Sequence, residues 1–380
     1  MDYADSRWHI LLIGPGTITA MSDREKQLES LNDRLDRFEA GIDRLVCHDV
    51  LERAVVAALG GPLPPGPAKR RWPIMSKLGA VRIRAFLRSY LKPPRGLFSL
   101  RQYPPRPLSV TISRPGPPRL DAPRFAIVTP SFNQARFVRA TVDSVLSQNY
   151  PNLAYVVQDG DSTDETKDLL GAYGDQLSWT SAPDGGQTAA INAGFGTVSG
   201  DIMAYLNSDD LLLPGSLEAV ADAFARHPDV DIIYSHRIII DDAGHEIGRW
   251  VLPPHDRQAI GWADYLPQET MFWRRRVWDA IGPFDESFRY AMDWDFILRA
   301  ERAGFQFKRL PLFLGCFRVH ETQKTTAINE VGMMETARLR QAHLGFVPNQ
   351  AEVEKAIAAY IRRHKIFHLA HHVRRSFAKV

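Results

Sequence analysis

Cysteine is nearly absent from this chain of 380 residues, which contains only Cys47 and Cys316. Neither belongs to a Cys-x-x-Cys pair or to a repeated metal-ligand spacing, so the sequence indicates no disulfide framework and no thiolate metal site. This cysteine usage favours a reducing compartment, and we expect a cytoplasmic protein.

Long apolar runs are also missing. No stretch of about eighteen apolar residues occurs, so we expect no transmembrane helix. The short apolar run at residues 10–13 follows Asp2 and Asp5 and is interrupted by glycine and proline at 14–16, unlike a secretory leader. We therefore expect a protein that is soluble or peripheral to a membrane.

The glycine loops of two common nucleotide-binding folds are not present. No Gly-x-x-x-x-Gly-Lys-Ser/Thr sequence occurs. Residues 194–200 look like Gly-x-Gly-x-x-Gly, but the third glycine comes one place late, and the motif ends a helical pattern instead of opening one. The sequence therefore argues against a dinucleotide-binding oxidoreductase.

Acidic residues are absent from Arg53 to Leu120, where fourteen Lys and Arg lie among prolines and glycines. Residues 1–120 carry 20 basic and 11 acidic side chains, residues 121–348 carry 20 and 31, and residues 349–380 carry 7 and 2. An acidic central domain is thus flanked by two basic extensions, which we expect to face something anionic.

The N-terminal region, residues 1–60, contains a helical pattern that opens with a capping box of Ser22 and Glu25. Apolar residues then recur at spacings of three and four: Leu28, Leu31, Leu35, Phe38, Ile42 and Leu45. This seam of about three heptads is compatible with a short coiled coil and a homodimer. A single amphipathic helix lying on the core explains it equally well.

Residues 61–120 are expected to form a basic linker, and Ile74 to Leu91 within it could form an amphipathic helix. Residues 349–380 predict a second basic amphipathic helix. Such charges suit an anionic membrane surface at the inner face of the cell membrane. Nucleic acid would attract them too, but no nucleic-acid module is recognisable, so we expect no nucleic-acid partner. A linker without a fixed partner is the alternative.

The central segment, residues 121–348, alternates short apolar runs with helical patterns. Strands are expected near residues 125–129, 153–157, 177–180 and 202–206, with helices between them. This order predicts an α/β domain with a mainly parallel, twisted sheet and helices on both faces. Ligands bind such sheets at the carboxyl ends of the strands, so the residues after each strand are candidates for a site.

Polar residues follow all four expected strands: Thr129, Pro130, Ser131 and Asn133, then Asp159 and Asp161, then Asp184 and Gln187, then Asp209 and Asp210. Taken singly, such residues are ordinary in turns and helix caps. Four sets at corresponding positions indicate one pocket.

The pair Asp209 and Asp210 comes directly after an apolar strand, where adjacent carboxylates repel unless a cation lies between them. Oxygen ligands suit Mg²⁺ or Mn²⁺, which usually meets a nucleotide through one or two carboxylates, phosphate oxygens and water. We therefore predict a divalent-cation site at a nucleotide diphosphate. A solvated loop that caps the helix after Pro214 is the alternative.

These motifs resemble the inverting family-2 glycosyltransferases, which have a GT-A fold, over roughly residues 124–325. Residues 127–133 are similar to the opening strand and loop of that family, 158–164 to its nucleoside-binding loop and 206–215 to its metal-binding segment. Residues 267–275 and 292–299 are similar to its acceptor-side strand and its catalytic-base helix. Ala189 and Ala193 depart from the acidic residue and the lysine that many relatives carry nearby.

The resemblance implies a metal-dependent, inverting transfer of a sugar from a nucleotide-diphosphate donor to a hydroxyl of a glycan or lipid-linked acceptor, in cell-envelope or extracellular glycan synthesis. It implies that Asp159 contacts the base and that Asp209 and Asp210 engage ribose, diphosphate and metal. Asp293 would be the general base, because an acceptor hydroxyl is a poor nucleophile until its proton is taken. An N-cap role for Asp293 is compatible with this, and Asp295 is a weaker alternative base.

Further residues complete the predicted site: Asn192 beside the nucleotide, His320 beside the metal, and Gln268, Glu269, Trp273 and Trp294 on the side of the acceptor or the donor sugar. Two other functions are compatible with the same sequence. One is a catalytically silent module that binds a sugar nucleotide or a glycan. The other is a membrane scaffold built from the extensions.

Overall fold

The computed structural model describes residues 102–108, 122–321, 323 and 329–377. The predicted coiled coil and the predicted amphipathic helix of residues 74–91 lie outside the described residues. The described residues up to 357 belong to one compact unit, and the described residues from 358 onward belong to a second. Among the described residues, none of the helices combines the length and the apolar character needed to cross a bilayer.

Ten strands and the helices between them make up the described part. The strands are β1 (Gln102–Arg106), β2 (Phe125–Ser131), β3 (Leu153–Asp159), β4 (Ser178–Ser181), β5 (Ile202–Tyr205), β6 (Leu211–Leu212), β7 (Ile232–Ile240), β8 (Glu246–Trp250), β9 (Phe272–Arg274) and β10 (Phe307–Arg318). The helices are α4 (Val138–Leu146), α5 (Thr166–Gly171), η2 (Gly174–Gln176), α6 (Gln187–Thr197), α7 (Ser216–Arg226), α8 (Arg257–Ile260), η3 (Gln268–Thr270), α9 (Arg275–Ile281), α10 (Met292–Arg302), α12 (Asn329–Leu344) and α13 (Gln350–Phe377).

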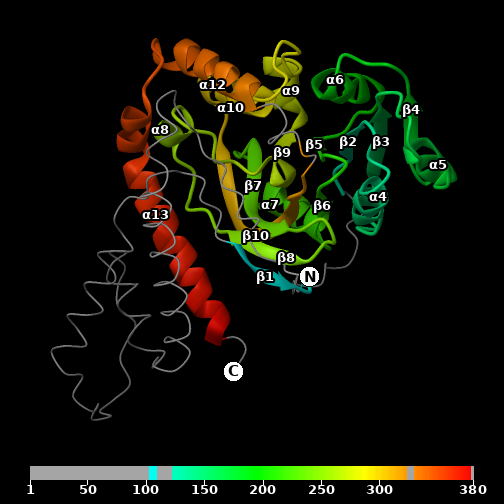
Figure 1. The fold of residues 1–380 in the computed structure, drawn as a ribbon, viewed down its shortest axis with the longest axis horizontal. Coiled ribbons are helices and arrows are strands. Elements are labelled where there is room, and N and C mark those ends of the chain that lie inside the picture. Colours follow the sequence, from blue (N-terminus) through cyan, green and yellow to red (C-terminus); the bar gives the residue numbers. More distant parts are fainter. Residues whose placement is uncertain (1–101, 109–121, 322, 324–328, 378–380) are drawn as a thin grey trace. The chain divides into compact units, whose positions relative to one another are not determined.

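One mixed sheet runs through the domain in the order β1-β8-β7-β9-β5-β2-β3-β4 (Figure 1), and β10 pairs with β7 and β6. Strands β4, β3, β2 and β5 are parallel neighbours, so their carboxyl ends meet at one edge. β9 is antiparallel to both β5 and β7, and β10 runs parallel to β7. The predicted α/β architecture with a mainly parallel sheet is confirmed.

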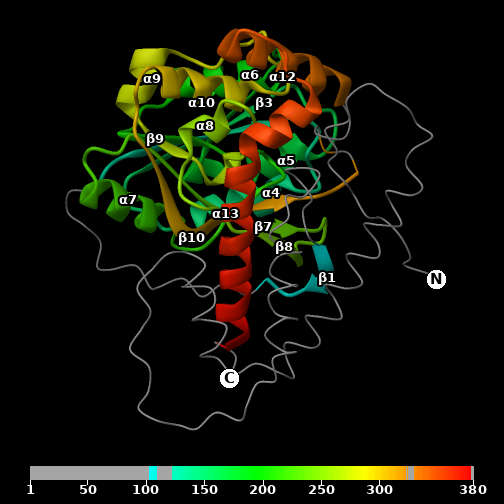
Figure 2. The same cartoon turned by 90° about the vertical axis from the view of Figure 1, so that its left-hand side faces the viewer.

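Helices cover both faces of this sheet, as its alternating buried side chains require. On one face, Phe125 and Ile127 pack with apolar residues of α4, α5 and α7. On the other face, α6 and the aromatic residues of β9 and α10 pack together through contacts such as Phe195 with Trp273. Figure 2 shows α6, α9, α10 and α12 gathered at the same end of the domain.

The segment predicted to be a linker, residues 61–120, contains an ordered strand. β1 pairs antiparallel with β8 at the edge of the sheet. Glu246 of β8 has a fully buried side chain that accepts hydrogen bonds from Tyr103 and Arg106 of β1. These buried polar contacts, which sequence patterns do not reveal, explain why a run rich in proline and arginine adds to the sheet.

Candidate functional site

The loops after β2 and β3 are locked together by hydrogen bonds between side chains of one loop and backbone amides of the other. The Asn133 amide donates to the Ser162 hydroxyl at 2.7 Å, and Ala135 N donates to Asp164 at 2.9 Å. In return, the Asn133 side-chain oxygen accepts from Thr163 N at 2.9 Å. Reciprocal bonds of this kind fix both loops as one rigid unit at the carboxyl ends of the strands.

Two predicted nucleotide-side residues in this unit have left-handed backbone conformations, which are uncommon for residues other than glycine. The φ angle is 53° at Asn133 and 64° at Asp161. The Asp161 carboxylate is 3.0 Å from the Lys167 ammonium. Nearby, the buried hydroxyl of Ser131 has no hydrogen-bond partner among the described residues. Local strain and an unsatisfied polar group are both features of binding sites.

Asp159 fixes the same loop through hydrogen bonds to its side chain. Its two oxygens accept hydrogen bonds from the amide and the hydroxyl of Ser162, at 2.9 and 2.5 Å, and from the Ser181 hydroxyl at 2.7 Å. Only 2% of Asp159 is exposed. Thr129 is also buried, and its hydroxyl lies 3.0 Å from the Tyr155 hydroxyl. In this structure both side chains are occupied by contacts within the protein.

Asp184 and Pro130 complete the predicted nucleotide side. Pro130 is a buried residue near the end of β2. Asp184 is exposed and accepts a hydrogen bond from Gly186 N at 2.7 Å. A Cβ atom at Gly160 would lie 3.0 Å from the Asp184 carboxylate, so the loops after β3 and β4 are in direct contact. The structure therefore brings three of the four predicted loops together.

Phe132 was missed by the sequence analysis. This residue stands between Ser131 and Asn133, and 59% of it is exposed. An exposed aromatic ring in a loop of fixed geometry offers a flat face for a nucleobase. The signal in the sequence was a lone aromatic residue within a polar strand-end loop.

The predicted cation ligands lie together after β5. The imidazole Nε2 of His320 is 2.9 Å from Asp209 Oδ2, and Asp210 Oδ1 accepts a hydrogen bond from Arg318 N at 3.0 Å. The rings of Phe137 and His320 are 4.6 Å apart, and the Arg318 guanidinium lies 5.0 Å from the same Phe137 ring. The end of β10 is thereby attached to the end of β5.

The two aspartates differ in their environments. The Asp209 side chain is 21% exposed, whereas only 2% of Asp210 is exposed. Burial, and after it the charges of Asp209 and Glu269, raise the pKa of Asp210 well above its ordinary value. The burial of Asp210 overturns the alternative of a solvated loop.

Among the described residues, no group of three or more His, Cys, Asp and Glu side chains is arranged so that it could hold a metal ion. Asp209 and Asp210 are adjacent carboxylates of the kind that bind Mg²⁺ or Mn²⁺ together with phosphate oxygens and water. His320 contacts Asp209 directly.

A chain of amide hydrogen bonds joins this pair to the predicted acceptor side. The Gln268 amide nitrogen donates to the backbone oxygen of Tyr205 at 2.7 Å, and its oxygen accepts from Asn207 at 3.1 Å. The Asn207 oxygen in turn accepts from Gln187 at 2.6 Å. Two predicted residues, Gln187 and Gln268, thus meet at Asn207, which the sequence analysis did not assign.

Glu269 forms a buried ion pair. Its two oxygens accept hydrogen bonds from the Arg237 guanidinium at 2.8 and 2.5 Å. The guanidinium also lies near the rings of Trp250 and Phe317, at 5.2 and 4.6 Å from their centroids. Only 2% of Glu269 is exposed, and its buried carboxylate neutralises the Arg237 guanidinium.

The predicted base, Asp293, lies in the first turn of α10. The N-cap of that helix is Ala291, so the N-cap role considered for Asp293 is wrong. One Asp293 oxygen accepts a hydrogen bond from Trp294 N at 2.9 Å. The alternative base Asp295 is 2.7 Å from the Arg299 guanidinium in an ion pair, which leaves Asp293 as the better candidate.

Four carboxylates surround Tyr205, the last residue of β5. Burial, and after it the charges of Asp293, Asp264, Asp210 and Glu269, raise the pKa of this phenol well above its ordinary value. Asp210 of the predicted cation pair and the predicted base, Asp293, therefore both lie within electrostatic range of one residue. Asp264 was not predicted, and its own pKa is raised well above the ordinary value by burial and then by Asp293.

Three predicted residues lie elsewhere than expected. Trp273 is completely buried in an aromatic cluster, at 6.0 Å from the Phe284 ring. The Asn192 side chain binds the backbone of Phe284 through both its oxygen and its nitrogen, at 3.1 and 2.9 Å, so it holds a loop before α10. Trp294 is also buried. Sequence motifs place such residues near a site but do not tell which of them face inward.

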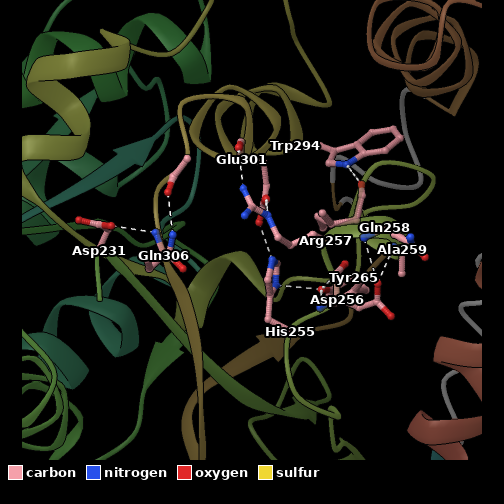
Figure 3. A network of polar contacts seen from close by, with 12 residues as sticks. Asp231, His255, Asp256, Arg257, Gln258, Ala259, Tyr265, Trp294, Glu301 and Gln306 are labelled. Atoms are coloured by element: carbon pink, nitrogen blue, oxygen red, sulfur yellow. Dashed lines mark hydrogen bonds and ion pairs between the residues drawn. The ribbon is translucent and has the colours of Figure 1, made fainter. Parts of the chain in front are cut away.

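Trp294 takes part in the anchoring of residues 253–266 to α10 (Figure 3). Its indole nitrogen donates to the backbone oxygen of Ile260 at 2.8 Å. Glu301, two turns further along α10, lies 2.5 Å from His255 Nε2 and accepts from Arg257 at 2.7 Å. The segment that leads to Asp264 is therefore fixed to the helix that carries Asp293.

The strand order, with two carboxylates at the end of β5 and a third on α10, defines a domain of the GT-A type. Residues 126–282 match the family model described as Glycosyl transferase family 2. An uncharacterized glycosyltransferase of Rickettsia typhi is 27% identical over 221 residues, which cover 55% of this chain and 69% of that protein. A PGL/p-HBAD biosynthesis glycosyltransferase of Mycobacterium bovis is 29% identical over 183 residues, covering 47% of this chain and 70% of that protein. Through this segment the chain is similar to glycosyl transferase family 2, and the family match and the similar relatives support glycosyltransferase activity.

Two similar solved structures have low sequence identity. Staphylococcus aureus TarS 1–349 in complex with UDP-GlcNAc has a TM-score of 0.49 at 19% identity, over 63% of this chain and 72% of that chain. The mannosyltransferase PcManGT of Pyrobaculum calidifontis, in complex with GDP-Man and Mn²⁺, has a TM-score of 0.44 at 18% identity, over 76% of this chain and 77% of that chain.

Proposed function

We propose that this protein is an inverting glycosyltransferase that needs a divalent cation, Mn²⁺ or Mg²⁺, and moves a sugar from a nucleotide-diphosphate donor to an acceptor hydroxyl. Asp293 would be the general base, and Asp209, Asp210 and His320 would hold the cation. The interlocked loops that contain Asn133 would hold the nucleoside.

The observation that carries this proposal is the pair of carboxylates at the carboxyl end of β5, which is connected to the start of α6. Asp209 and Asp210 follow this strand, and hydrogen bonds from Gln268 to Tyr205, from Asn207 to Gln268 and from Gln187 to Asn207 make the connection. The charges of Asp210 and Asp293 both act on Tyr205, the last residue of β5. A sugar donor bound at Asp210 would therefore lie close to the predicted base.

In the proposed reaction, Asp293 accepts the proton of the acceptor hydroxyl as the oxygen attacks the anomeric carbon. The new bond forms on the face opposite the nucleoside diphosphate, which leaves with the electrons of the broken bond, so the configuration inverts. The cation would stabilise the charge of that leaving group as a Lewis acid. The alternative base, Asp295, is paired with the Arg299 guanidinium at 2.7 Å, which makes it the weaker candidate.

The acceptor class and the location are further parts of the proposal. A glycan or lipid-linked acceptor of the cell envelope, reached at the inner face of the membrane, fits the two basic extensions. Their net charges, from 20 basic and 11 acidic side chains before residue 121 and 7 and 2 after residue 348, would favour an anionic surface. Most of these residues lie outside the described part of the chain.

The test compares Asp293→Asn with Asp295→Asn in the full-length protein. A panel of UDP-, GDP- and dTDP-sugars with Mn²⁺ first selects a sugar donor by thermal shift and by release of nucleoside diphosphate. Asp293→Asn is expected to lower kcat by about 10³-fold, the usual contribution of a general base, while the affinity for UDP or GDP with Mn²⁺ is retained. Asp295→Asn should lower kcat by less than about 10-fold.

Transfer by Asp293→Asn at the wild-type rate would show that another group is the base. The absence of cation-dependent turnover with every sugar nucleotide, together with clear binding, would favour the catalytically silent module.

A further inference from the structure

One face of helix α12 packs against residues 285–291, the loop that leads into α10, the helix that carries Asp293. The two helices lie side by side in both views of the fold (Figures 1 and 2). Gly332, Glu335 and Arg338 follow one another at a spacing of three residues, so they share this face. A Cβ atom at Gly332 would lie only 3.0 Å from the Tyr290 ring, which shows how closely the backbone of α12 approaches the loop.

Glu335, in the middle of that face, binds the loop through three backbone amides. Its Oε1 accepts from Arg289 N at 2.7 Å, and its Oε2 accepts from Tyr290 N at 2.8 Å and from Ala291 N at 2.9 Å. Only 8% of Glu335 is exposed. Amide hydrogen bonds to a buried carboxylate are among the stronger ones in proteins, since one partner is charged.

These amides lie at the start of α10, which has no cap of its own. The N-cap residue is Ala291, and its side chain cannot accept a hydrogen bond. The first amides of any helix lack partners within the helix. A Ser, Thr, Asp or Asn at the N-cap would bind the second or third helical amide, whereas Glu335 binds the amide of the N-cap residue itself and those of the two residues before it. Asp293 is only two residues beyond Ala291.

Helix α6 holds the same loop from the other side. The Thr188 hydroxyl donates to the backbone oxygen of Phe288 at 2.8 Å, and the Asn192 amide donates to Phe284 and to Glu286, both at 2.9 Å. Arg338 of α12 reaches Ser287 from the opposite side at 3.0 Å. The loop is thus held between α6, which begins at the sugar-donor side, and α12, and Glu335 holds its last three residues.

We propose that Glu335 is a positioning residue for the reaction: it fixes the first turn of α10 so that the Asp293 carboxylate lies where the acceptor hydroxyl is activated. The inference rests on the proposed role of Asp293 as the base. Glu335 lies outside the family-matched segment of residues 126–282 and touches neither the cation pair nor the nucleotide loops. Its removal should therefore affect the chemical step and leave the binding of the sugar donor intact.

The experiment measures steady-state transfer, or hydrolysis where water is the acceptor, for full-length Glu335→Gln, Glu335→Ala and Asp293→Asn. Glu330→Gln is the matched control, because Glu330 is an exposed residue in the first turn of the same helix. The dissociation constants of UDP and GDP with Mn²⁺ are measured by calorimetry. Hydrogen exchange of the amides at 289–291 reports directly on the hydrogen bonds.

Glu335→Ala is expected to lower kcat by about 30- to 100-fold, since a displacement of about 1 Å at a catalytic group can cost 10²-fold. The KM for the sugar donor and the nucleotide dissociation constant should stay within about two-fold, because no donor-side contact is lost. Glu335→Gln keeps one accepting oxygen and should lower kcat by only about 3- to 10-fold. The three amides should exchange at least about 10-fold faster in the alanine variant.

The results separate this inference from the proposed function. If Asp293→Asn transfers sugar at the wild-type rate, the proposed function fails, and with it the role assigned to Glu335. If Asp293→Asn is inactive but Glu335→Ala and Glu335→Gln have wild-type kcat, the function stands and the inference is overturned. Equal losses of kcat and of nucleotide affinity in Glu335→Gln would also overturn it, because they would indicate general damage to the fold.

Discussion

The loops after β2 and β3 and the loop before α10 are held in place in different ways. In the first pair, residues about thirty positions apart bind one another, as Asn133 does with Ser162 and Thr163. Before α10, the partners are much further away along the chain, since Asn192 binds Phe284 across 92 residues and Glu335 binds Ala291 across 44. The nucleotide side is a local unit, whereas the base side is assembled from three distant helices.

This difference indicates whether damage to each half of the site should affect nucleotide binding or the rate of the reaction. The nucleotide loops fold with their own strands, so damage there should weaken binding without displacing the base. The base depends on the packing of α6, α10 and α12, so damage there should slow the reaction without weakening nucleotide binding. Asp209 and Asp210, the proposed cation pair, follow β5, and changes to them should affect both nucleotide binding and the reaction.

The largest effect is expected for Asp210→Asn, which alters the group shared by both halves. Loss of a charged cation ligand should lower kcat/KM by at least about 10³-fold, because metal stabilisation of a leaving group is worth several kcal/mol. Asp209→Asn should cause a similar loss. Activity assays at saturating Mn²⁺ measure both. Retention of wild-type kcat/KM in both variants would remove the cation from the proposed function.

Asp210→Asn should also change the stability of the folded protein, by an amount that depends on pH. The pKa of Asp210 is raised in the folded protein by burial and by Asp209, so ionisation opposes folding at every pH above the ordinary value of its carboxyl group. Asp210→Asn should therefore raise the melting temperature at pH 7 to 8 in EDTA, and the gain should shrink as the pH falls toward 4. A gain that grows on acidification would contradict this sign.

Much of the nucleotide side could be predicted from the sequence because its signals are local. Four polar motifs followed four apolar strands, and the parallel order placed them at one edge. Patterns of this kind do not report orientation. Trp273 lies at the expected position of a motif, but its side chain is buried in the aromatic core. The Asp159 carboxylate accepts hydrogen bonds from Ser162 and Ser181 within the protein.

The base side could be predicted only in part. Asp293 was found because it lies within a motif on one helix. Glu335 and Asp264 carry no local signal, since a glutamate on a helix and an aspartate in a loop are ordinary surface residues in a sequence. Their roles follow from contacts that form only when α12 and residues 253–266 pack against α10.

A smaller effect, on binding alone, is expected for Asn133→Gly. Glycine tolerates the φ of 53° at this position but cannot accept the hydrogen bond from Thr163. The KM for the sugar donor should rise by about 10-fold, with kcat changed less than about 3-fold, and the free energy of unfolding should fall by about 1 kcal/mol. Asn149→Gly is the matched control, because Asn149 has a φ of 49° and lies in the turn after α4. A loss of kcat in Asn133→Gly larger than its change in KM would break the division between the two halves.

The smallest effect is expected for Asp264→Asn, on the pH dependence of stability at the base side. Burial, and after it the charge of Asp293, raise the pKa of Asp264 well above its ordinary value, so ionisation of Asp264 opposes folding at every pH above that ordinary value. Asp264→Asn should therefore raise the melting temperature at pH 7 to 8, and the gain should shrink as the pH falls toward 4. The kcat should change less than about 5-fold, because an uncharged carboxyl group is replaced by an uncharged amide of similar shape. Asp256→Asn is the control: Asp256 caps α8 in the same segment by accepting from Gln258 and Ala259, and it is not among the charges that act on Tyr205 or Tyr290. That variant should keep its stability within about 0.5 kcal/mol, because Asn caps a helix about as well as Asp. A gain in Asp264→Asn that grew on acidification, or an equal gain in both variants, would contradict the burial of an ionisable Asp264.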